Sequence, residues 1–469
     1  MNKNTASLAS IEDLRRRVRK VLPDYGDTLL TIIDALAAGP RIAAPSEVSL
    51  SPLCVFALST LYSALRTASE TARPGSKRAR SLKQLLKRVR RQREAWLDEW
   101  GRALGVPDSE LGSWGVFVLD ATNYSRPNAP TVRRGYAHGA DGMRPGHALS
   151  VLARRVASGS WTLPLQIDLV PVGEAPGAHG AQQIVDFIAT HGWAPEDVLA
   201  VDAGYTNVPT MRPMVEAAVN LVGRISGRRV LFRAPGPPPV KPKRGRRRLY
   251  GARVQLWDQR TLPKAALDEE VRLEDGRRFE ITRYDERADA TLARSTHHAL
   301  FASDRVIEYR ASGQRRFRRP LWLIYVGAMK APLPASRRAR SIYAARFSIE
   351  HGFRFLKREL GLVSGQFNGE GALDRAQLWV ELVATAFWEL FAMSQQARAA
   401  SATAGADATS KPVTPGAVRK QVVAIFARLA LERPTPVSRG KSPGRPDGTR
   451  FEPRKRHRIF RKRKPKRAA

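Results

Sequence analysis

The feature that most constrains the fold is a series of apolar runs between residues 114 and 225. Five runs read "WGVFVLDAT", "HALSVLARRV", "WTLPLQIDLV", "DVLAVDAG" and "AVNLVGRI". Short apolar runs bounded by turn residues are typical of buried strands, whereas "AQQIVDFIATHG", before the fourth run, has the period of a helix. Three strands, a helix and further strands predict an α/β sheet.

A helical region is expected before this sheet. From residue 11 to residue 104 the apolar residues recur at helical spacing, which predicts a helical N-terminal domain over residues 1–105. Its last helix carries six basic residues within three turns: Lys83, Lys87, Arg88, Arg90, Arg91 and Arg93. A run of this kind suits a solvated surface as well as a DNA-facing helix, and Lys87, Arg88 and Arg91 are the predicted DNA contacts.

The sequence after residue 225 changes character. Residues 226–318 begin with "GPPPVKPKRGRRR" and then carry the short runs "RVQLWD", "RFEITRYDE" and "DRVIEYRAS", which predict a β-rich insertion. The apolar run "PLWLIYVGAM" then returns the chain to the main sheet, and a long helix begins near Ser336. We therefore expect residues 106–225 and 319–400 to form two parts of one α/β unit, and the whole chain to be a multidomain α/β protein.

The C-terminal part divides into an apolar helix and a polar remainder. The helix "GALDRAQLWVELVATAFWELFAMSQQA" is expected to belong to the core. Residues 401–469 are expected to form a low-complexity linker, a short helix and a basic tail. From residue 433 onward the sequence has 15 Lys and Arg against two acidic residues. Such a tail is expected to be disordered in isolation and to bind a polyanion.

The overall charge favours nucleic acid as the partner. The chain has 80 Lys and Arg against 43 Asp and Glu, a formal net charge of +37, and such a surplus is self-repulsive unless a polyanion neutralises it. The single cysteine, Cys54, excludes an internal disulfide and is expected to pack as a small apolar residue. No apolar run approaches the ~18 residues of a membrane span. We expect no membrane contact and a cytoplasmic protein that acts at the nucleoid.

Two aspartates lie where apolar strands are predicted to end. Asp120 ends "GVFVLD", and Asp202 ends "VLAVD" before a turn at Gly204. Carboxylates at the carboxyl ends of strands lie where α/β sheets bind ligands, so the two would meet if their strands are neighbours. Each aspartate alone could equally be a turn former or a helix cap.

The helix that begins near Ser336 contains the stretch "YAARFSIEHGFRFLK". At ~100° per residue, Tyr343, Arg346, Glu350 and Lys357 fall within a sector of roughly 60° on one face. Local ion pairing is the alternative explanation, but Arg346 before Glu350 is the less favourable order for such a pair. We therefore expect Arg346 to contact DNA, and Glu350 to join the two aspartates as a third carboxylate. Three carboxylates beside a phosphate are suited to holding Mg²⁺.

These residues resemble a known family. The spacing Y-(2)-R-(3)-E-(6)-K is similar to the signature of one group of bacterial insertion-sequence transposases, which belong to the DDE class and have an RNase H-like catalytic core. The segment "FVLDATNYSRPNA" looks like the first-Asp strand of that family, and "LAVDAGYTN" looks like its second-Asp strand and turn. The resemblance covers about residues 114–360, with the β-rich insertion between the second Asp and the Glu.

The resemblance implies a role for each matched residue. Asp120 would bridge two Mg²⁺ (or Mn²⁺) ions, while Asp202 and Glu350 would each complete one metal site. Tyr343, Arg346 and Lys357 would hold phosphates near the scissile strand. The reaction would be hydrolytic nicking at the transposon end, followed by attack of the freed 3′-OH on target DNA.

The resemblance also bears on partners. Members of the family often use an aromatic residue of the insertion to stack on a displaced base. Trp257 is the candidate here, although a packed core position is the more ordinary expectation for it. The partners would be the double-stranded terminal repeats of the transposon and target DNA, bound by a homodimer.

Two other functions remain open from the sequence. One is a nuclease of the same core that cuts without joining, and the other is a catalytically silent DNA-binding protein derived from a transposase. His138, His147 and His351 show no zinc-binding spacing, and we expect structural or loop roles for them.

Overall fold

The computed structural model describes most, but not all, of the chain. The described residues are 16–69 and 84–93, both with short gaps, 115–126, 136–139, 142–156, 161–232, 252–284 without 274, 300–327, 336–367, 371–403 and 414–430. The basic tail predicted from residue 433 onward lies outside them.

The first half of the central sheet has the predicted strands in the predicted order. Strands β1 (Gly115–Ser125), β3 (Gly142–Arg155) and β4 (Thr162–Leu169) are antiparallel neighbours, whereas β5 (Asp197–Val201) and β6 (Leu221–Ile225) run parallel to β1. Three antiparallel strands followed by two parallel ones form a mixed sheet, which is consistent with the expected RNase H-like core.

Two helices make the crossovers between the parallel strands. Helix α5 (Pro176–His191) precedes β5 and packs on β1 and β3, and α6 (Val208–Glu216) precedes β6 and packs on α5. The short strand β2 (Tyr136–Gly139) pairs with the start of β3 at one edge of the sheet. The helix predicted from "AQQIVDFIATHG" is therefore confirmed as α5.

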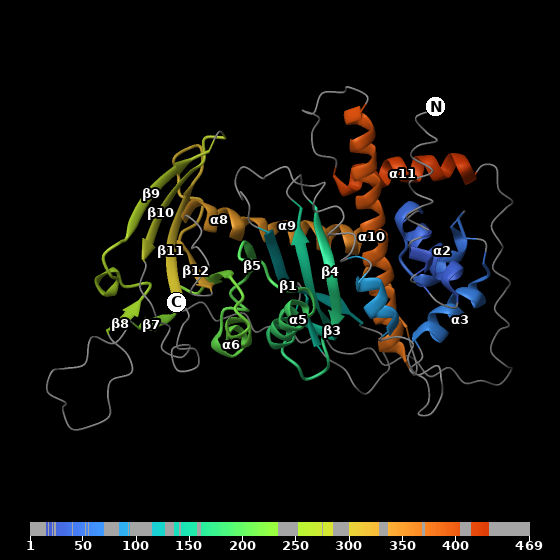
Figure 1. The fold of residues 1–469 in the computed structure, drawn as a ribbon, viewed down its shortest axis with the longest axis horizontal. Helices are drawn as coiled ribbons and strands as arrows, with labels where there is room; N and C mark the ends of the chain where they lie inside the picture. The colour runs from blue at the N-terminus through green and yellow to red at the C-terminus, as the bar shows by residue number, and fades with distance from the viewer. Residues whose placement is uncertain are drawn as a thin grey trace, which may run out of the picture.

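The β-rich insertion continues the central sheet. Strand β12 (Leu321–Gly327) pairs antiparallel with β6, as the sequence predicts, and further strands follow it outward in the order β11, β10 and β9. Their bounds are β11 Leu300–Tyr309, β10 Arg278–Tyr284 and β9 Leu267–Arg272. Strands β7 (Val230–Phe232) and β8 (Arg253–Gln255) form a separate two-stranded sheet, and a 3-10 helix follows at Gln259–Thr261. Within the described residues the central sheet thus has ten strands (Figure 1).

The helix predicted from Ser336 consists of two consecutive helices. Helix α8 (Ser336–Ala345) and helix α9 (Phe347–Arg358) are separated by a turn at Arg346. The backbone N–H of Arg346 donates to Tyr343, and that of Ile349 donates to Arg346, so the chain is more tightly wound here than in an α-helix. Helix α8 lies over β5, β6, β10 and β12, and α9 lies over β1 and β4 (Figure 1).

Helix α10 (Ala372–Thr403) forms the C-terminal part of the core, as predicted from its apolar sequence. Trp379, Trp388 and Phe387 are fully buried in it, and the helix packs on β4, α2 and α3. Helix α10 continues through residue 403, past the linker boundary predicted at residue 401. Helix α11 (Pro415–Ala430) then packs against α10 and α2.

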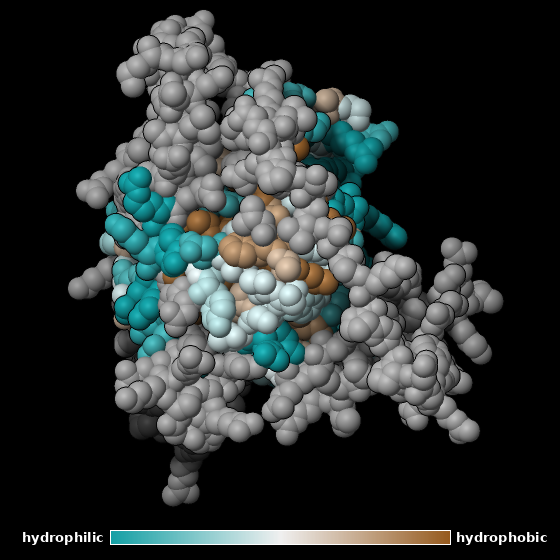
Figure 2. All heavy atoms as spheres, turned by 90° about the vertical axis from the view of Figure 1, so that its right-hand side faces the viewer, coloured by the Kyte–Doolittle hydropathy of each residue, from teal (hydrophilic) through white to brown (hydrophobic). Residues whose placement is uncertain are grey.

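The described N-terminal residues are largely helical, as predicted. They include α2 (Gly26–Ala38), a 3-10 helix at Pro45–Leu50 and α3 (Leu58–Ser69). Cys54 is only 4% exposed, which confirms its expected packing as a small apolar residue. On this side of the molecule, apolar and weakly polar residues gather near the centre and hydrophilic residues surround them (Figure 2). None of the helices among the described residues combines the length and apolar character needed to cross a membrane.

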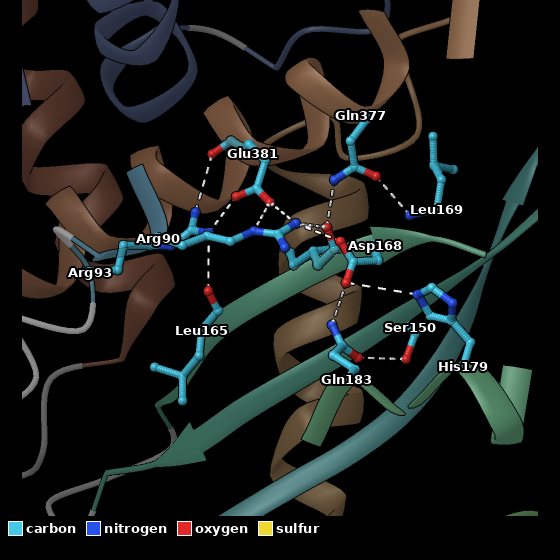
Figure 3. Close-up of polar contacts among 11 residues, drawn as sticks. Arg90, Arg93, Ser150, Leu165, Asp168, Leu169, His179, Gln183, Gln377 and Glu381 are labelled. Atoms are coloured by element: carbon cyan, nitrogen blue, oxygen red, sulfur yellow. Dashed lines mark hydrogen bonds and ion pairs between the residues drawn. The ribbon is translucent and has the colours of Figure 1, made fainter. Parts of the chain in front are cut away.

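The basic helical segment over residues 84–93 is fixed to the core by buried ion pairs (Figure 3). Arg90 donates to Glu381 of α10 at 2.8 Å and also pairs with Asp168 at the end of β4. Arg93, which is fully buried, pairs with the second oxygen of Glu381. Burial alone would raise the pKa of Asp168, but Arg90 outweighs it and lowers that pKa to about 2.

These ion pairs divide the basic residues of segment 84–93 into two sets. Arg90 and Arg93 point into the molecule, so for them both sequence interpretations, a solvated surface and a DNA contact, are wrong. Lys87, Arg88 and Arg91 are exposed on the opposite side. Lys87, Arg88 and Arg91 are therefore accessible to DNA, and the contacts predicted for them stay a prediction.

Candidate active site

Asp120 and Asp202 lie on neighbouring strands. Strands β1 and β5 are adjacent and parallel, and their last paired residues are Leu119 and Val201. The two aspartates are the next residues on each strand, so the predicted meeting of the two carboxylates follows from the sheet register. Asp202 directly follows β5, as predicted. Asp120 does not end its strand, because β1 continues to Ser125 through its pairing with β3.

The alternation of side chains along β1 determines which way Asp120 faces. Leu119 packs against Gly180 of α5, so its neighbour Asp120 faces the opposite side of the sheet, where α8 and α9 lie. Thr122, two residues further on, shares this side with Asp120. The first half of the site is therefore a polar stretch within a strand whose preceding residues, 116–119, are buried.

Helices α8 and α9 bring the residues of the Y-R-E-K pattern against this side of the sheet. The Tyr343 hydroxyl donates to Oδ1 of Asp202 at 3.3 Å. Arg346 donates from Nη1 to Oδ2 of Asp120 at 3.0 Å and from Nη2 to Oε1 of Glu350 at 3.3 Å. Because the turn at Arg346 does not rotate these residues apart, the predicted common face is present, and Arg346 lies between two of the three carboxylates.

Lys357 reaches the same strand, two helical turns after Glu350. Its Nζ donates to the Thr122 hydroxyl at 2.6 Å, and burial lowers the pKa of Lys357. The sequence prediction missed the part played by Thr122. Its position two residues after Asp120, on the same side of the strand, is the signal that could have found it.

The carboxylates interact electrostatically. The pKa of Asp120 is raised, first by burial and then by the negative charges of Asp202 and Glu350, while Arg346 opposes this shift. The two members of the Arg346–Glu350 ion pair differ in exposure. The side chain of Glu350 is 50% exposed, whereas that of Arg346 is 6% exposed. Glu350 therefore forms the solvent-facing side of the cluster, and Asp120, whose side chain is 19% exposed, forms its inner side.

The ion pairs of Arg346 differ from the sequence expectation. The order of Arg346 and Glu350 disfavours a pair between ordinary helical positions, yet the pair forms because the turn at Arg346 and the nearby Asp120 carboxylate both draw the guanidinium inward. Its Nε is buried and has no hydrogen-bond partner among the described residues. In this structure the ion-pair partners of Arg346 are thus residues of the protein, and one N–H of its guanidinium group has no acceptor among the described residues.

The donor set suits a divalent metal once Arg346 moves away. As the side chains stand, no group of three or more His, Cys, Asp or Glu among the described residues is arranged to hold a metal ion. The guanidinium of Arg346, however, occupies the space between Asp120 and Glu350 as a cation would. Asp120 and Glu350 already share this positive charge, and Asp202 follows the strand beside that of Asp120. Three such hard carboxylate donors fit Mg²⁺ or Mn²⁺.

Trp257 lies apart from this cluster. It follows β8, in the small two-stranded sheet, and it is 64% exposed. The expectation that Trp257 packs in the core is therefore wrong. An exposed tryptophan remains able to stack on a base.

The histidines do not extend the cluster. His147 is buried in β3, and burial together with Arg126 lowers its pKa. His351 is exposed on α9, next to Glu350. The side chain of His138 lies outside the described part of the structure.

Comparisons with known proteins bear on the class of enzyme. Residues 78–288 match the model of the family described as DDE superfamily endonuclease. The match spans Asp120 and Asp202 and ends before Glu350. It confirms the prediction of a DDE-class enzyme. A search of curated proteins finds no match.

Among solved structures, the chain is similar to the cryo-EM structure of a piggyBac transposase synaptic complex with hairpin DNA. The two are 11% identical, and the TM-score is 0.38. The alignment covers 90% of this chain and 77% of that chain.

Proposed function

We propose that this chain is a DNA transposase that cleaves DNA at transposon ends and transfers the resulting 3′-OH into target DNA. The observation that carries the proposal is the cluster in which Asp120 and Glu350 bind the Arg346 guanidinium and Asp202 lies next to Asp120 on the neighbouring strand. Binding DNA alone gives no reason to bring three carboxylates together in so basic a chain. The match to an endonuclease family supports the cleavage part of the reaction.

Asp120, Asp202 and Glu350 would hold two Mg²⁺ or Mn²⁺ ions. When bound, the ions would polarise the scissile phosphate, activate the attacking hydroxyl and stabilise the leaving oxygen. Asp120 would contribute to both metal sites, and Asp202 and Glu350 would each complete one of them. Arg346 would release the carboxylates and turn toward a DNA phosphate, which satisfies a guanidinium as well as a carboxylate does.

Other side chains would bind the DNA around the cleaved phosphate. Tyr343 and Lys357 line the same face as Arg346 and would hold the adjacent phosphates. The low pKa that burial gives Lys357 would rise beside a phosphate, because the anion favours the charged amine. Trp257 would stack on a displaced base.

The remaining contacts and the assembly follow from the same proposal. Lys87, Arg88 and Arg91 would bind the phosphate backbone further from the cut. The active assembly would be a homodimer on the two transposon ends, because both ends must be brought together. The Y-R-E-K spacing favours the bacterial insertion-sequence group, and the protein would act in the cytoplasm at the nucleoid.

The test is metal-dependent cleavage of the DNA that flanks the gene of this protein. Wild type should cut these ends with Mg²⁺ or Mn²⁺, and Glu350→Gln should lose more than the ~100-fold typical of an outer-shell metal partner. Glu216→Gln, which removes an exposed carboxylate from α6, is the matched control. Cleavage by Glu350→Gln at the wild-type rate would remove the three-carboxylate site from the proposal.

A second candidate is a nuclease that cuts without joining, which the description of the matched family favours. Pre-cleaved ends mixed with a supercoiled plasmid separate the two functions. Joined products are expected for a transposase, and cleavage without joined products would favour the nuclease.

A further inference from the structure

The connection between β11 and β12 is an exposed, arginine-rich hairpin. We call residues 310–320, "RASGQRRFRRP", the arginine hairpin. It carries five arginines within ten residues, and all residues from 310 to 319 are exposed. Phe317 lies among the arginines and is 55% exposed. A cluster of arginines with an exposed aromatic residue among them is typical of a surface that binds nucleic acid.

The backbone of the arginine hairpin is well defined. Gly313 has a φ of +80° and donates its N–H to the carbonyl of Arg310, which closes a tight turn. The N–H of Arg310 in turn donates to Gln314, and that of Arg316 donates to Glu308 of β11. The turn therefore presents its side chains from a fixed support rather than from a long loop.

Most of the charge on the arginine hairpin is uncompensated. Arg316 pairs with Glu308 and packs beside Phe317, with its guanidinium carbon 5.1 Å from the ring centre. Arg315, Arg318 and Arg319 have no acidic partner among the described residues. The guanidinium groups of these three exposed arginines are therefore available to an outside anion.

The sheet register places the arginine hairpin at the edge that carries the active site. Strand β5 ends at Val201, which pairs with Gly223 of β6, and Gly223 pairs with Ile324 of β12. Asp202 is therefore level with the beginning of β12, and the hairpin extends beyond the same edge, two strands away. From strand spacings of ~4.8 Å and a rise of ~3.3 Å per residue, Arg319 lies about 15 Å from Asp202.

Arg224 lies between the two sites. It is an exposed residue of β6, it pairs in the sheet with Leu323 at the start of β12, and its charge acts on Tyr343 in the active site. Exposed positive charge thus continues from the carboxylate cluster across β6 to the arginine hairpin. A polyanion that enters the active site would meet this charge along its path.

We propose that the arginine hairpin binds the DNA duplex beside the phosphate that the active site cleaves. Arg315, Arg318 and Arg319 contact its phosphates, and Phe317 packs against a sugar or base edge. At a rise of ~3.4 Å per base pair, a separation of about 15 Å places this contact roughly five base pairs from the cut. The proposal rests on the proposed function, because it takes the active site to be occupied by DNA.

The first experiment measures how DNA affinity depends on salt. The full chain binds a fluorescent duplex of about 40 base pairs, roughly four helical turns, taken from the DNA that flanks its gene. Removing three phosphate contacts in a variant with Arg315→Ala, Arg318→Ala and Arg319→Ala should lower the slope of log K against log salt by about 2 to 3. The control removes three exposed cations from separate elements, with Arg212→Ala, Lys264→Ala and Lys420→Ala, and should change the slope by less than one.

The second experiment locates the contact. A photoreactive benzoyl-phenylalanine in place of Phe317 should cross-link to the duplex about half a helical turn, or roughly five base pairs, from the cleaved phosphate. The hairpin proposal is overturned if wild type cleaves DNA but the salt slope of the triple variant is unchanged. Cross-links spread evenly along the duplex would also overturn it. In both cases the proposed function stands. If wild type cuts no DNA with any divalent metal, the proposed function fails, and the salt slope alone decides whether the hairpin binds DNA.

Discussion

Arg346 can pair with carboxylates of the protein or with a DNA phosphate, and the structure shows the carboxylate pairs. Its guanidinium neutralises Asp120 and Glu350, which would otherwise repel each other across the site. A phosphate and a pair of metal ions could replace both halves of this arrangement, the phosphate taking the arginine and the metals taking the carboxylates. Arg346 would then neutralise the carboxylates in the absence of metal and bind a DNA phosphate when metal and DNA are present.

This dual role predicts the behaviour of Arg346→Ala. Without metal, the variant should be less stable than wild type by about 1–3 kcal/mol. This is less than the 3–5 typical of a fully buried pair, because Glu350 is half exposed. Mg²⁺ should raise the melting temperature of the variant more than that of wild type, because the carboxylates no longer have a competing cation. Thermal unfolding with and without Mg²⁺ measures both effects.

Arg354→Ala is the control for this experiment, because Arg354 is an exposed arginine of α9, eight residues after Arg346. It should change neither the stability nor the response to Mg²⁺. If Arg346→Ala is as stable as wild type in the absence of metal, the internal ion pairs of Arg346 contribute nothing, and contact with DNA is its main role.

At this scale the sequence could predict the members of the cluster but not their pairing. The helical period placed Tyr343, Arg346, Glu350 and Lys357 on one face. The pattern of an apolar strand followed by Asp indicated Asp120 and Asp202. The contacts of Arg346 with Asp120 and of Lys357 with Thr122 join residues more than two hundred positions apart. Such pairs depend on how the helices cross the sheet, which local patterns do not contain.

At the scale of elements, segment 84–93 shows how one helix serves two purposes. Arg90 and Arg93 join it to β4 and α10 through Asp168 and Glu381 (Figure 3). Lys87, Arg88 and Arg91 are exposed. The inward set determines where the helix lies. The outward set is left free to meet a polyanion.

Substitutions on the two sides of this helix should therefore affect different properties, DNA binding on one side and stability on the other. Replacing Lys87, Arg88 and Arg91 with alanine should lower the salt slope of DNA binding by about 2 to 3 without changing the stability. Arg90→Ala should cost about 1–3 kcal/mol of unfolding free energy, because the buried Glu381 loses one partner and keeps Arg93. Chemical denaturation and salt titration of DNA binding measure these quantities. A loss of stability in the triple variant would show that its side chains belong to the fold.

Element type was predictable where the apolar period is strong, and element partners were less so. Strands β1, β3, β4, β5 and β6 and helix α10 follow from their own residues. That β12 returns to the main sheet was also predictable from its apolar run. That β9, β10 and β11 extend the same sheet was not, because pairing across an insertion is set by long-range register rather than by local composition.

At the scale of the whole molecule, helix α11 joins the C-terminal part to the N-terminal helices. Arg419 donates to Glu359, just after α9, at 3.1 Å and to the carbonyl of Gly39, just after α2, at 2.9 Å. Val418 and Val422 are buried in the same contact. Helix α11 is therefore part of the folded body, and the basic segment 433–469 follows it.

A truncation after α11 removes the basic segment and keeps every described residue of the chain. A chain truncated after Ala430 loses 15 Lys and Arg and two acidic residues beyond residue 432. It should unfold at the wild-type temperature and bind DNA with a clearly flatter salt dependence, because each lost phosphate contact removes ~0.9 from the slope. A chain truncated after Ala400 also loses α11 and the contacts of Arg419, so it should show the same flattening together with a lower melting temperature. Differential scanning calorimetry and salt titration distinguish the two truncations. If the first truncation binds DNA with an unchanged slope, residues 433–469 contribute no phosphate contacts, and the folded body carries the whole affinity for DNA.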